Sequence, residues 1–348
     1  MRHVLPALLF LISTTAAFAQ TIVAQTAAPP RSAQPSAPKF ELPIDCKFGE
    51  NCDVMQLVDH DNSTGWRDYR CGYLSYDTHK GTDFRITSID LMVHGVNVLA
   101  AAPGRVTAVR RGMADVSYRL VGRDVVTRRG LGNVVIIDHD GRWRTIYAHL
   151  KKDSIRVAKG QKVKSGQIIA QVGMSGLAEV PHLHFGVLRR NQVVDPFNGA
   201  DASHPCGATG ASLWTPQAFR KMRTKNAFIL HAGFSDSTKF NRIALTYGLN
   251  FKEDFPLKAK NFIFAVDFGG GHKGDEYEIQ IKAPGDKILA KTKKTIKKIV
   301  GFRFDFVGRK GNGRTWPKGL YKGQFALFRT TNGKRKKVLE TERQIWVR

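Results

Sequence analysis

Histidine and aspartate side chains recur in three short segments, and these are the residues best suited to chemistry. The segments are His79-Lys80-Gly81-Thr82-Asp83, Tyr147-Ala148-His149-Leu150 and Pro181-His182-Leu183-His184-Phe185. Residues two or four apart in a β-strand point to one face, so His79 can converge with Asp83, and His182 with His184. Two imidazoles and one carboxylate suffice to hold a catalytic zinc ion with water in the fourth position. Zinc lowers the pKa of that water and polarises a carbonyl group, as hydrolysis of an amide requires.

Short apolar runs separated by glycines surround these segments and predict a β-rich domain at residues 73–205. Gly130, Gly141 and Gly160 are among the glycines that separate the runs, and no long amphipathic helix pattern occurs here. The paired glycine turns of the segment around Gly160 to Gly173 also occur in lipoyl and biotinyl domains, but those domains need a modified lysine at a hairpin tip and would not need the histidines. The predicted strands cover residues 96–101, 134–138, 145–149, 167–172 and 182–187.

Over roughly residues 71–198 the chain resembles the lysostaphin-like, or LytM-type, zinc metallopeptidases. The matching motifs follow the order of that family: H-K-G-T-D, A-A-P-G-R-V, G-N-V-V-I-I-D-H, Y-A-H-L, V-A-K-G-Q-K-V-K-S-G-Q-I-I-A-Q-V-G-M-S-G, P-H-L-H-F and V-D-P-F. The resemblance implies an antiparallel β catalytic domain that cuts peptide bonds of bacterial peptidoglycan with a Zn²⁺ ion.

The resemblance also implies a role for each histidine of the three segments. His79, Asp83 and His184 match the family's metal ligands. His149 and His182 match its two catalytic histidines, one taking a proton from the zinc-bound water and the other stabilising the oxyanion. Which of the two takes the proton stays open. Family members also place a tyrosine near the tetrahedral intermediate, for which Tyr73 and Tyr76 are the candidates, and Asn133 is a candidate for bordering the substrate groove.

The remaining histidine motifs receive structural interpretations. His139-Asp140-Gly141 is interpreted as a hairpin turn, and His272-Lys273-Gly274-Asp275 as a glycine-rich turn. Asp59-His60-Asp61 is interpreted as a solvated loop, with a second metal site as the alternative.

The first residues are typical of a secretory signal peptide. Arg2 and His3 precede an apolar run over residues 4–12, and Ala17-Phe18-Ala19 forms an A-x-A cleavage site. We expect cleavage after Ala19, in preference to a buried N-terminal helix. Residues 20–40, rich in Ala, Pro, Ser and Gln, predict a disordered linker. No later segment is apolar enough to predict a transmembrane span.

Four cysteines indicate disulfides in an exported protein. The short spacing of Cys46 and Cys52 predicts a local loop and leaves Cys71 to pair with Cys206. Cysteine ligation of zinc is the weaker alternative, because no C-x-x-C pair occurs. Residues 41–72 hold three of the cysteines and few periodic runs, which predicts a loop-rich lead-in to the catalytic domain.

Residues 210–348 predict a second, basic domain with a β-sandwich fold. Apolar residues alternate with polar ones from Tyr277 to Lys282 and from Phe302 to Phe306, as in half-buried antiparallel strands. Residues 213–223 predict a short connecting helix. The basic residues of this domain cluster at Lys291, Lys293, Lys294, Lys297 and Lys298, at Arg309 and Lys310, and at Lys334, Arg335, Lys336 and Lys337.

The formal net charge of +26 attracts anionic partners. Export makes intracellular nucleic acid a poor partner, so we expect peptidoglycan as substrate and an anionic wall or outer-membrane surface as a second contact. The hypothesis is a zinc metalloendopeptidase in the periplasm of a Gram-negative bacterium that cuts D-alanyl–diaminopimelate cross-links. The rival hypotheses are a non-enzymatic regulator, against which the complete histidine set argues, and a polyanion binder.

Overall fold

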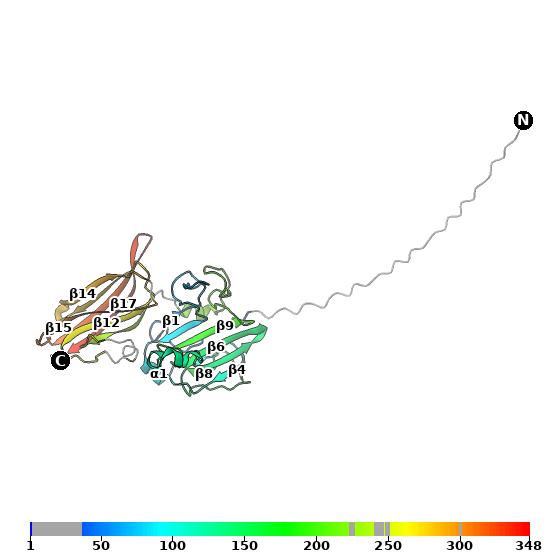
Figure 1. The fold of residues 1–348 in the computed structure, drawn as a ribbon, viewed down its shortest axis with the longest axis horizontal. Coiled ribbons are helices and arrows are strands. Elements are labelled where there is room, and N and C mark those ends of the chain that lie inside the picture. The colour runs from blue at the N-terminus through cyan, green and yellow to red at the C-terminus, as the bar shows by residue number, and fades with distance from the viewer. Residues whose placement is uncertain (2–36, 223–226, 240–246, 248–250, 299–300) are drawn as a thin grey trace. The chain divides into compact units, whose positions relative to one another are not determined.

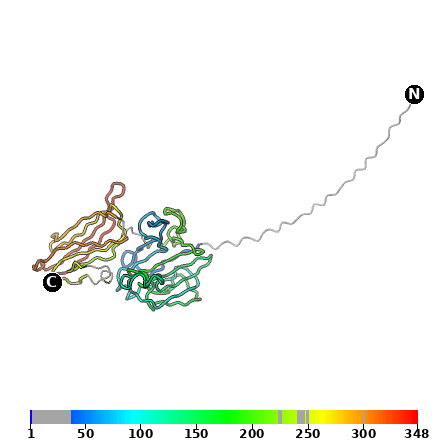
Figure 2. The backbone as a smooth tube through the Cα atoms, in the orientation of Figure 1, coloured from blue at the N-terminus to red at the C-terminus, as the bar shows by residue number. Residues whose placement is uncertain are grey.

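The computed structural model describes Met1 and residues 37–222, 227–239, 247, 251–298 and 301–348 of the chain. The predicted signal peptide after Met1, and the predicted linker up to residue 36, lie outside the described residues. The described chain is built mainly of β-strands (Figure 1), as the glycine-separated runs predict, and Figure 2 follows its backbone. Among the described residues, no helix has the length and apolar character needed to cross a membrane.

One antiparallel sheet carries all three histidine segments. Its strands lie in the order β1-β2-β9-β6-β5-β4-β7, and β10 pairs with β9. Long-range pairing therefore brings β2, β9 and β6 side by side although they are far apart in the sequence. The strands are β1 (Cys52–Gln56), β2 (Thr82–Ile86), β4 (Gly104–Arg110), β5 (Asn133–His139), β6 (Trp143–Leu150), β7 (Lys162–Val163), β9 (His182–Arg189) and β10 (Gln192–Val193).

A separate two-stranded sheet, β3 (Asn97–Leu99) and β8 (Ile168–Gln171), contributes to the same core. The five strands predicted in this region are β3, β5, β6, β8 and β9, with ends displaced by at most two residues. Alternation sends Tyr147, Leu183 and Phe185 into the core, where each is fully buried. Burial of one such side chain contributes about 1.5–3 kcal/mol.

The lead-in at residues 41–72 is more ordered than its sequence suggests. Cys52–Gln56 forms strand β1, which pairs with β2 at the edge of the sheet. The Cys46–Cys52 disulfide closes the loop before β1, and the Cys71–Cys206 disulfide joins the lead-in to the end of the catalytic region. Both predicted pairings are confirmed.

The helices are short. Thr215 caps α4 by accepting a hydrogen bond from the Ala218 N–H, and Pro216 occupies the first turn, where its missing N–H costs nothing. Trp214, Ala218 and Met222 all belong to the core of the catalytic region. The helices are α1 (Ile89–His94), α2 (Tyr118–Val121), α3 (Arg123–Thr127) and α4 (Pro216–Lys221), with 3₁₀ turns at Asp140–Arg142 and Pro284–Asp286.

The chain from residue 228 onward forms two antiparallel sheets, β11-β12-β15 and β14-β13-β16-β17. Side chains of both sheets, including Phe264 and Tyr277, share one buried cluster. Asn332 and Gly333 both have positive φ and form the tight turn between the two longest strands, β16 and β17. The strands are β11 (Phe228–Ser235), β12 (Asn261–Gly269), β13 (Glu276–Lys282), β14 (Ile288–Thr295), β15 (Phe302–Lys310), β16 (Gly319–Thr331) and β17 (Lys334–Val347).

Candidate metal centre

Two neighbouring strands next to the edge strand β1 place an aspartate opposite a histidine. Asp83 on β2 pairs in register with His184 on β9, and His182 lies two residues earlier on β9. Because alternate residues of a strand share a face, both imidazoles point away from the core that Leu183 fills. The predicted convergence of His182 and His184 is therefore present, for the predicted reason.

His79 reaches the same place by a different route from the one predicted. Strand β2 begins at Thr82, so His79 lies in the loop before it, and strand alternation does not align it with Asp83. Gly81 permits the close approach of this loop to β9, because a Cβ atom there would lie 2.6 Å from two ring atoms of His184. His79 and Asp83 do converge, but the strand geometry offered for that convergence was wrong.

Three ligand atoms meet at this point. His79 Nε2 lies 3.2 Å from Asp83 Oδ1 and 3.3 Å from His184 Nδ1, and the last two atoms are 2.9 Å apart. All three side chains are buried. Within the described ranges, this is the one group of three or more His, Cys, Asp or Glu residues that brings its ligand atoms so close together.

Backbone hydrogen bonding directs the lone pair of His79 toward the group. His79 Nδ1 donates a proton to the carbonyl oxygen of Leu57, at 2.7 Å. In the neutral imidazole the lone pair then lies on Nε2, facing a carboxylate oxygen and a second imidazole nitrogen. Converging lone pairs repel one another unless a cation lies between them, so the arrangement is suited to a cation.

The spacing of the three atoms fits a tetrahedral ion. Zinc binds imidazole nitrogen and carboxylate oxygen at about 2.0–2.2 Å, which sets donor atoms about 3.3–3.6 Å apart around a tetrahedron. The observed separations of 2.9, 3.2 and 3.3 Å lie at or below the lower end of that range. Small side-chain movements would therefore let His79, Asp83 and His184 hold such an ion.

His149 and His182 border this group and resemble each other in their hydrogen bonding. Each donates its Nδ1 proton to a backbone carbonyl at 2.8 Å, His149 to Ser175 and His182 to Val180. Their ring centres lie 4.6 Å apart, and His149 lies 6.0 Å from His184. His149 has a φ of +57°, an uncommon conformation of the kind that clusters at functional sites. In both rings Nε2 is therefore available for chemistry beside the candidate ligands His79, Asp83 and His184.

Burial and neighbouring charges set the protonation of these side chains. Burial disfavours the Asp83 carboxylate, but the charges of His79 and His182 and two hydrogen bonds outweigh it, so the pKa of Asp83 lies well below its ordinary value. Burial also lowers the pKa of His149 far below its ordinary value, and the neighbouring His182 and His184 lower it further. At neutral pH these directions give a carboxylate ligand and a neutral His149 imidazole.

A pocket of about 450 Å³ opens onto Asp83 and His182. Tyr76 also lines it, with its ring stacked on His79 at 4.3 Å between ring centres. Several lining residues were not anticipated from the sequence, because no local pattern marks them and distant pairings bring them here. They are Tyr118, Arg119, Arg123, Leu177, Glu179 and Val180, together with Leu230, Asp267 and Phe302 from the strands after residue 227.

The other candidates from the sequence lie elsewhere. Tyr73 packs against Arg67 and His272, whereas Tyr76 stacks on His79 of the candidate metal centre. Asn133 is buried, and its side chain bonds to the backbone of Met113 and Leu150, which gives it a structural position rather than one at the groove. The predicted turns at residues 139–141 and 272–275 are both present.

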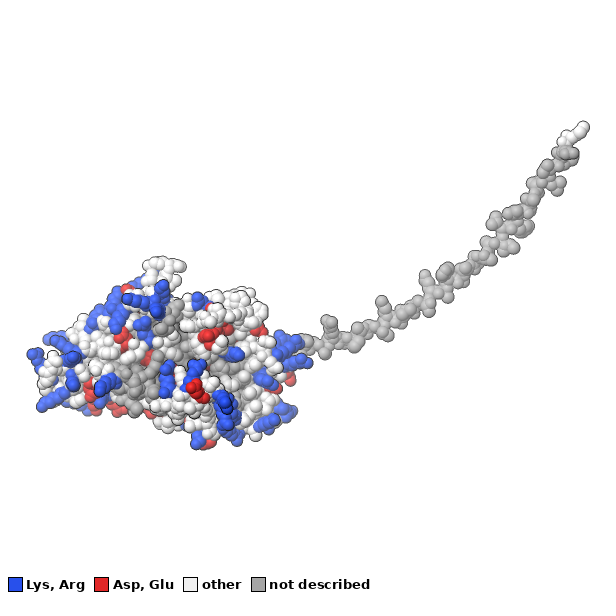
Figure 3. Space-filling model, in the orientation of Figure 1, with Lys and Arg blue, Asp and Glu red and all other residues white. Residues whose placement is uncertain are grey.

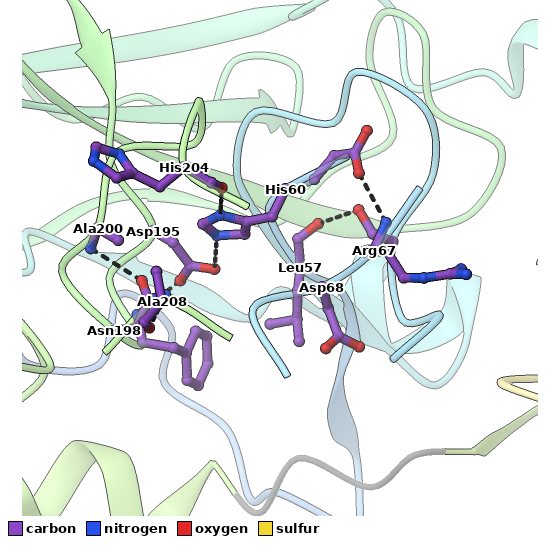
Figure 4. Close-up of polar contacts among 12 residues, drawn as sticks. Leu57, His60, Arg67, Asp68, Asp195, Asn198, Ala200, His204 and Ala208 are labelled. Atoms are coloured by element: carbon purple, nitrogen blue, oxygen red, sulfur yellow. Dashed lines mark hydrogen bonds and ion pairs between the residues drawn. The ribbon is translucent and has the colours of Figure 1, made fainter. Parts of the chain in front are cut away.

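The segment Asp59-His60-Asp61 is not the solvated loop that its composition suggests, because Asp59 and His60 are buried. His60 lies between the backbone of His204 and the carboxylate of Asp195 (Figure 4), at 3.0 Å and 3.2 Å. Both ring nitrogens face acceptors, which only an imidazolium satisfies. Burial alone would lower the pKa of His60, but these hydrogen bonds and the Asp195 charge raise it above its ordinary value.

Part of the chain is similar in sequence to known peptidases. Residues 77–196 match the profile described as Peptidase family M23. The chain is 39% identical over 117 residues to the peptidoglycan DD-endopeptidase ShyB of Vibrio cholerae, covering 34% of this chain and 22% of ShyB. It is 29% identical over 162 residues to lysostaphin of Staphylococcus staphylolyticus, covering 44% of this chain and 28% of lysostaphin. The matches thus span about a quarter of the length of these relatives.

One solved structure in the comparison is the catalytic domain of the prophage-encoded M23 protein EnpA from Enterococcus faecalis, in a mutant form. It is 25% identical, with a TM-score of 0.30, and the match covers 43% of this chain and 92% of that domain. The matched profile begins two residues before His79 and ends twelve residues after His184, so it contains all five histidine and aspartate positions of the site. Residues 77–196 of the chain are thus similar to peptidase family M23.

Proposed function

We propose that the chain is an exported zinc endopeptidase that hydrolyses the peptide cross-links of bacterial peptidoglycan. The observation that carries the proposal is the convergence of His79 Nε2, Asp83 Oδ1 and His184 Nδ1 beside two further imidazoles. The choice of peptidoglycan as the substrate rests on the similar proteins, because ShyB is named a peptidoglycan DD-endopeptidase.

The donor set favours zinc over harder cations. Two imidazole nitrogens and one carboxylate oxygen are ligands typical of catalytic zinc, whereas calcium and magnesium prefer oxygen donors alone. His79, Asp83 and His184 would hold the ion, and the Leu57 carbonyl would fix the orientation of His79. Once bound, zinc supplies a Lewis acid and a water of lowered pKa.

In this proposal, His149 and His182 have the two remaining catalytic roles. One Nε2 accepts the proton of the attacking water, and the other ring, when protonated, donates a hydrogen bond to the oxyanion that forms on the scissile carbonyl. The backbone carbonyls of Ser175 and Val180 hold the two rings in place, so neither ring has to reorient during the reaction. The hydrogen-bonding pattern permits either assignment of the two roles.

The proposed bond is the amide between D-alanine and diaminopimelate. Two disulfides agree with an oxidising compartment outside the cytoplasm, and direct cross-links of this kind are those expected in a Gram-negative periplasm. The name of ShyB agrees with this choice of bond, whereas the similarity to lysostaphin does not distinguish it from a glycine bridge.

The proposal is tested by removing and restoring the metal. Purified protein should carry about one zinc ion per chain. Chelation should abolish the release of soluble fragments from purified peptidoglycan sacculi, and stoichiometric zinc should restore it. Undiminished release by metal-free protein would refute the proposed mechanism.

A further inference from the structure

The pocket beside the metal ligands carries two arginines from one short segment between β4 and β5. Arg119 lies on α2 and Arg123 begins α3, and both line the pocket together with Asp83 and His182. Both residues are exposed. Neither contributes to the sheet or its core, so packing does not explain the presence of two guanidinium groups here.

The two arginines differ in how their charge is compensated. Arg119 forms a two-pronged pair with Glu179, with contacts of 2.7 Å and 3.0 Å. The backbone carbonyl of Arg123 accepts a hydrogen bond from the hydroxyl of Thr127. Over the described ranges, the guanidinium of Arg123 forms no ion pair or side-chain hydrogen bond. Arg123 lines the same pocket as Tyr76, the residue stacked on His79, and as Asp83 and His182. A guanidinium without an ionic partner among the described residues therefore belongs to the pocket that opens onto the candidate metal centre.

A planar guanidinium recognises carboxylates in particular, through two parallel hydrogen bonds. The proposed substrate has a free carboxylate close to the scissile bond. In a D-alanyl–diaminopimelate cross-link, the carbon that bears the scissile nitrogen also bears a free carboxylate. In a glycine bridge the corresponding carbon leads into another amide and carries no charge. Asp77 and Asp267 also line the pocket, so its overall charge does not favour an anionic ligand. Recognition of a carboxylate would therefore depend on the guanidinium of Arg123.

We propose that Arg123 is a specificity-determining residue that binds the free carboxylate adjacent to the scissile nitrogen. The inference rests on the proposed function and deepens it, because it makes the direct diaminopimelate cross-link the preferred substrate class. Recognition of this carboxylate would add binding energy to that substrate and none to a glycine bridge.

The test compares two soluble cross-linked peptides that differ in one group. One carries the free diaminopimelate carboxylate beside the scissile amide, and the other carries a carboxamide there. Wild-type protein should cleave the acid with a kcat/KM about ten- to a hundredfold higher than the amide, as expected for one hydrogen-bonded charge pair. Arg123→Gln in the full chain should lose that preference by slowing cleavage of the acid alone. Arg128→Gln, which removes the same charge from the end of α3 and outside the pocket lining, should behave as wild type.

A second measurement separates this inference from the proposed function. The affinity of the protein for the two product peptides, acid and amide, is measured by calorimetry and needs no turnover. Tighter binding of the acid that depends on Arg123 would uphold the carboxylate site even if neither cross-linked peptide were cleaved. Equal losses on acid and amide in Arg123→Gln, or no preference in the wild type, would overturn it.

Discussion

Asp83 and His184 face each other across the β2–β9 ladder, with Asp83 Oδ1 2.9 Å from His184 Nδ1. Two of the three proposed ligands are therefore fixed by the pairing register of buried strands. A shift of one residue would turn one of them toward the core. The third ligand, His79, depends instead on a loop that is held by the Leu57 carbonyl and by the small size of Gly81.

Ligands and catalytic residues should respond differently to substitution. Asp83→Ala removes the only charged ligand and should abolish both zinc binding and hydrolysis. His149→Ala and His182→Ala should keep zinc but slow hydrolysis by about a hundredfold or more, as expected for loss of a general base or an oxyanion donor. Metal analysis of each purified variant, paired with its hydrolysis rate, provides the check. Loss of metal from His149→Ala as complete as from Asp83→Ala would show that the roles are wrongly divided.

Gly81 is predicted to be required for metal affinity although it carries no side chain. The Cβ of Gly81→Ala would lie 2.6 Å from His184 and 2.8 Å from the Phe185 carbonyl, so the His79 loop or His184 must move. We expect a loss of about ten- to a hundredfold in zinc affinity, as for other residues that orient ligands. Competition with a zinc-binding dye measures the zinc affinity of the variant and of the wild type. Gly130→Ala is the matched control, because the nearest atom to its Cβ would be an ordinary 3.5 Å away; equal affinity in both variants would remove this role from Gly81.

The buried pair of His60 and Asp195 should make stability depend on pH. The pKa of His60 is raised in the folded protein, so its contribution is complete below the unfolded pKa and disappears as pH rises through the folded value. His60→Gln should therefore cost about 1–3 kcal/mol of unfolding free energy near pH 6, and less at alkaline pH. Denaturant unfolding at several pH values measures the difference. A cost for His60→Gln that grew with pH would contradict the pairing.

The charged surface supports a prediction about binding to the cell wall. Lysine and arginine side chains are scattered over the face shown in Figure 3 and occupy more of it than acidic side chains do. Lys291, Lys293 and Lys294 form ion pairs with neighbouring acidic residues. In the described part of the chain, the exposed Lys297, Lys334 and Lys336 have no such partner.

We therefore expect replacement of Lys297, Lys334 and Lys336 by glutamine to weaken binding to sacculi several-fold at low salt. The difference from wild type should shrink as salt screens exposed charge, with a Debye length of about 8 Å at physiological ionic strength. Cosedimentation at low and high salt measures it. The matched control replaces the exposed Lys159, Lys162 and Lys164 of the catalytic region. Equal weakening by both triple variants would assign binding to net charge and not to the strands after residue 228.

Features of the site that depend on local sequence patterns could be predicted from the sequence. Contacts that depend on the pairing of distant segments could not. The H-x-H segment lies on a strand and projects both imidazoles to one face, which two-residue alternation is enough to foresee. Nothing near Leu57 indicates that its carbonyl orients His79, because that contact depends on β1 joining the sheet. His60 was interpreted as solvated because its neighbours are polar, yet its carboxylate partner is 135 residues away. Arg123 likewise lies in a segment without any recognisable motif.

Mass spectrometry of the muropeptides that the zinc-loaded protein releases from purified sacculi identifies the bond that is cut. We expect cross-linked dimers to become monomers, with a new D-alanine carboxylate on one stem and a free diaminopimelate amine on the other. Chelated protein and Asp83→Ala should leave the dimers intact. Products cut in the glycan, products cut between the glycan and the stem peptide, or dimers left uncut by zinc-loaded protein would refute the proposed endopeptidase activity.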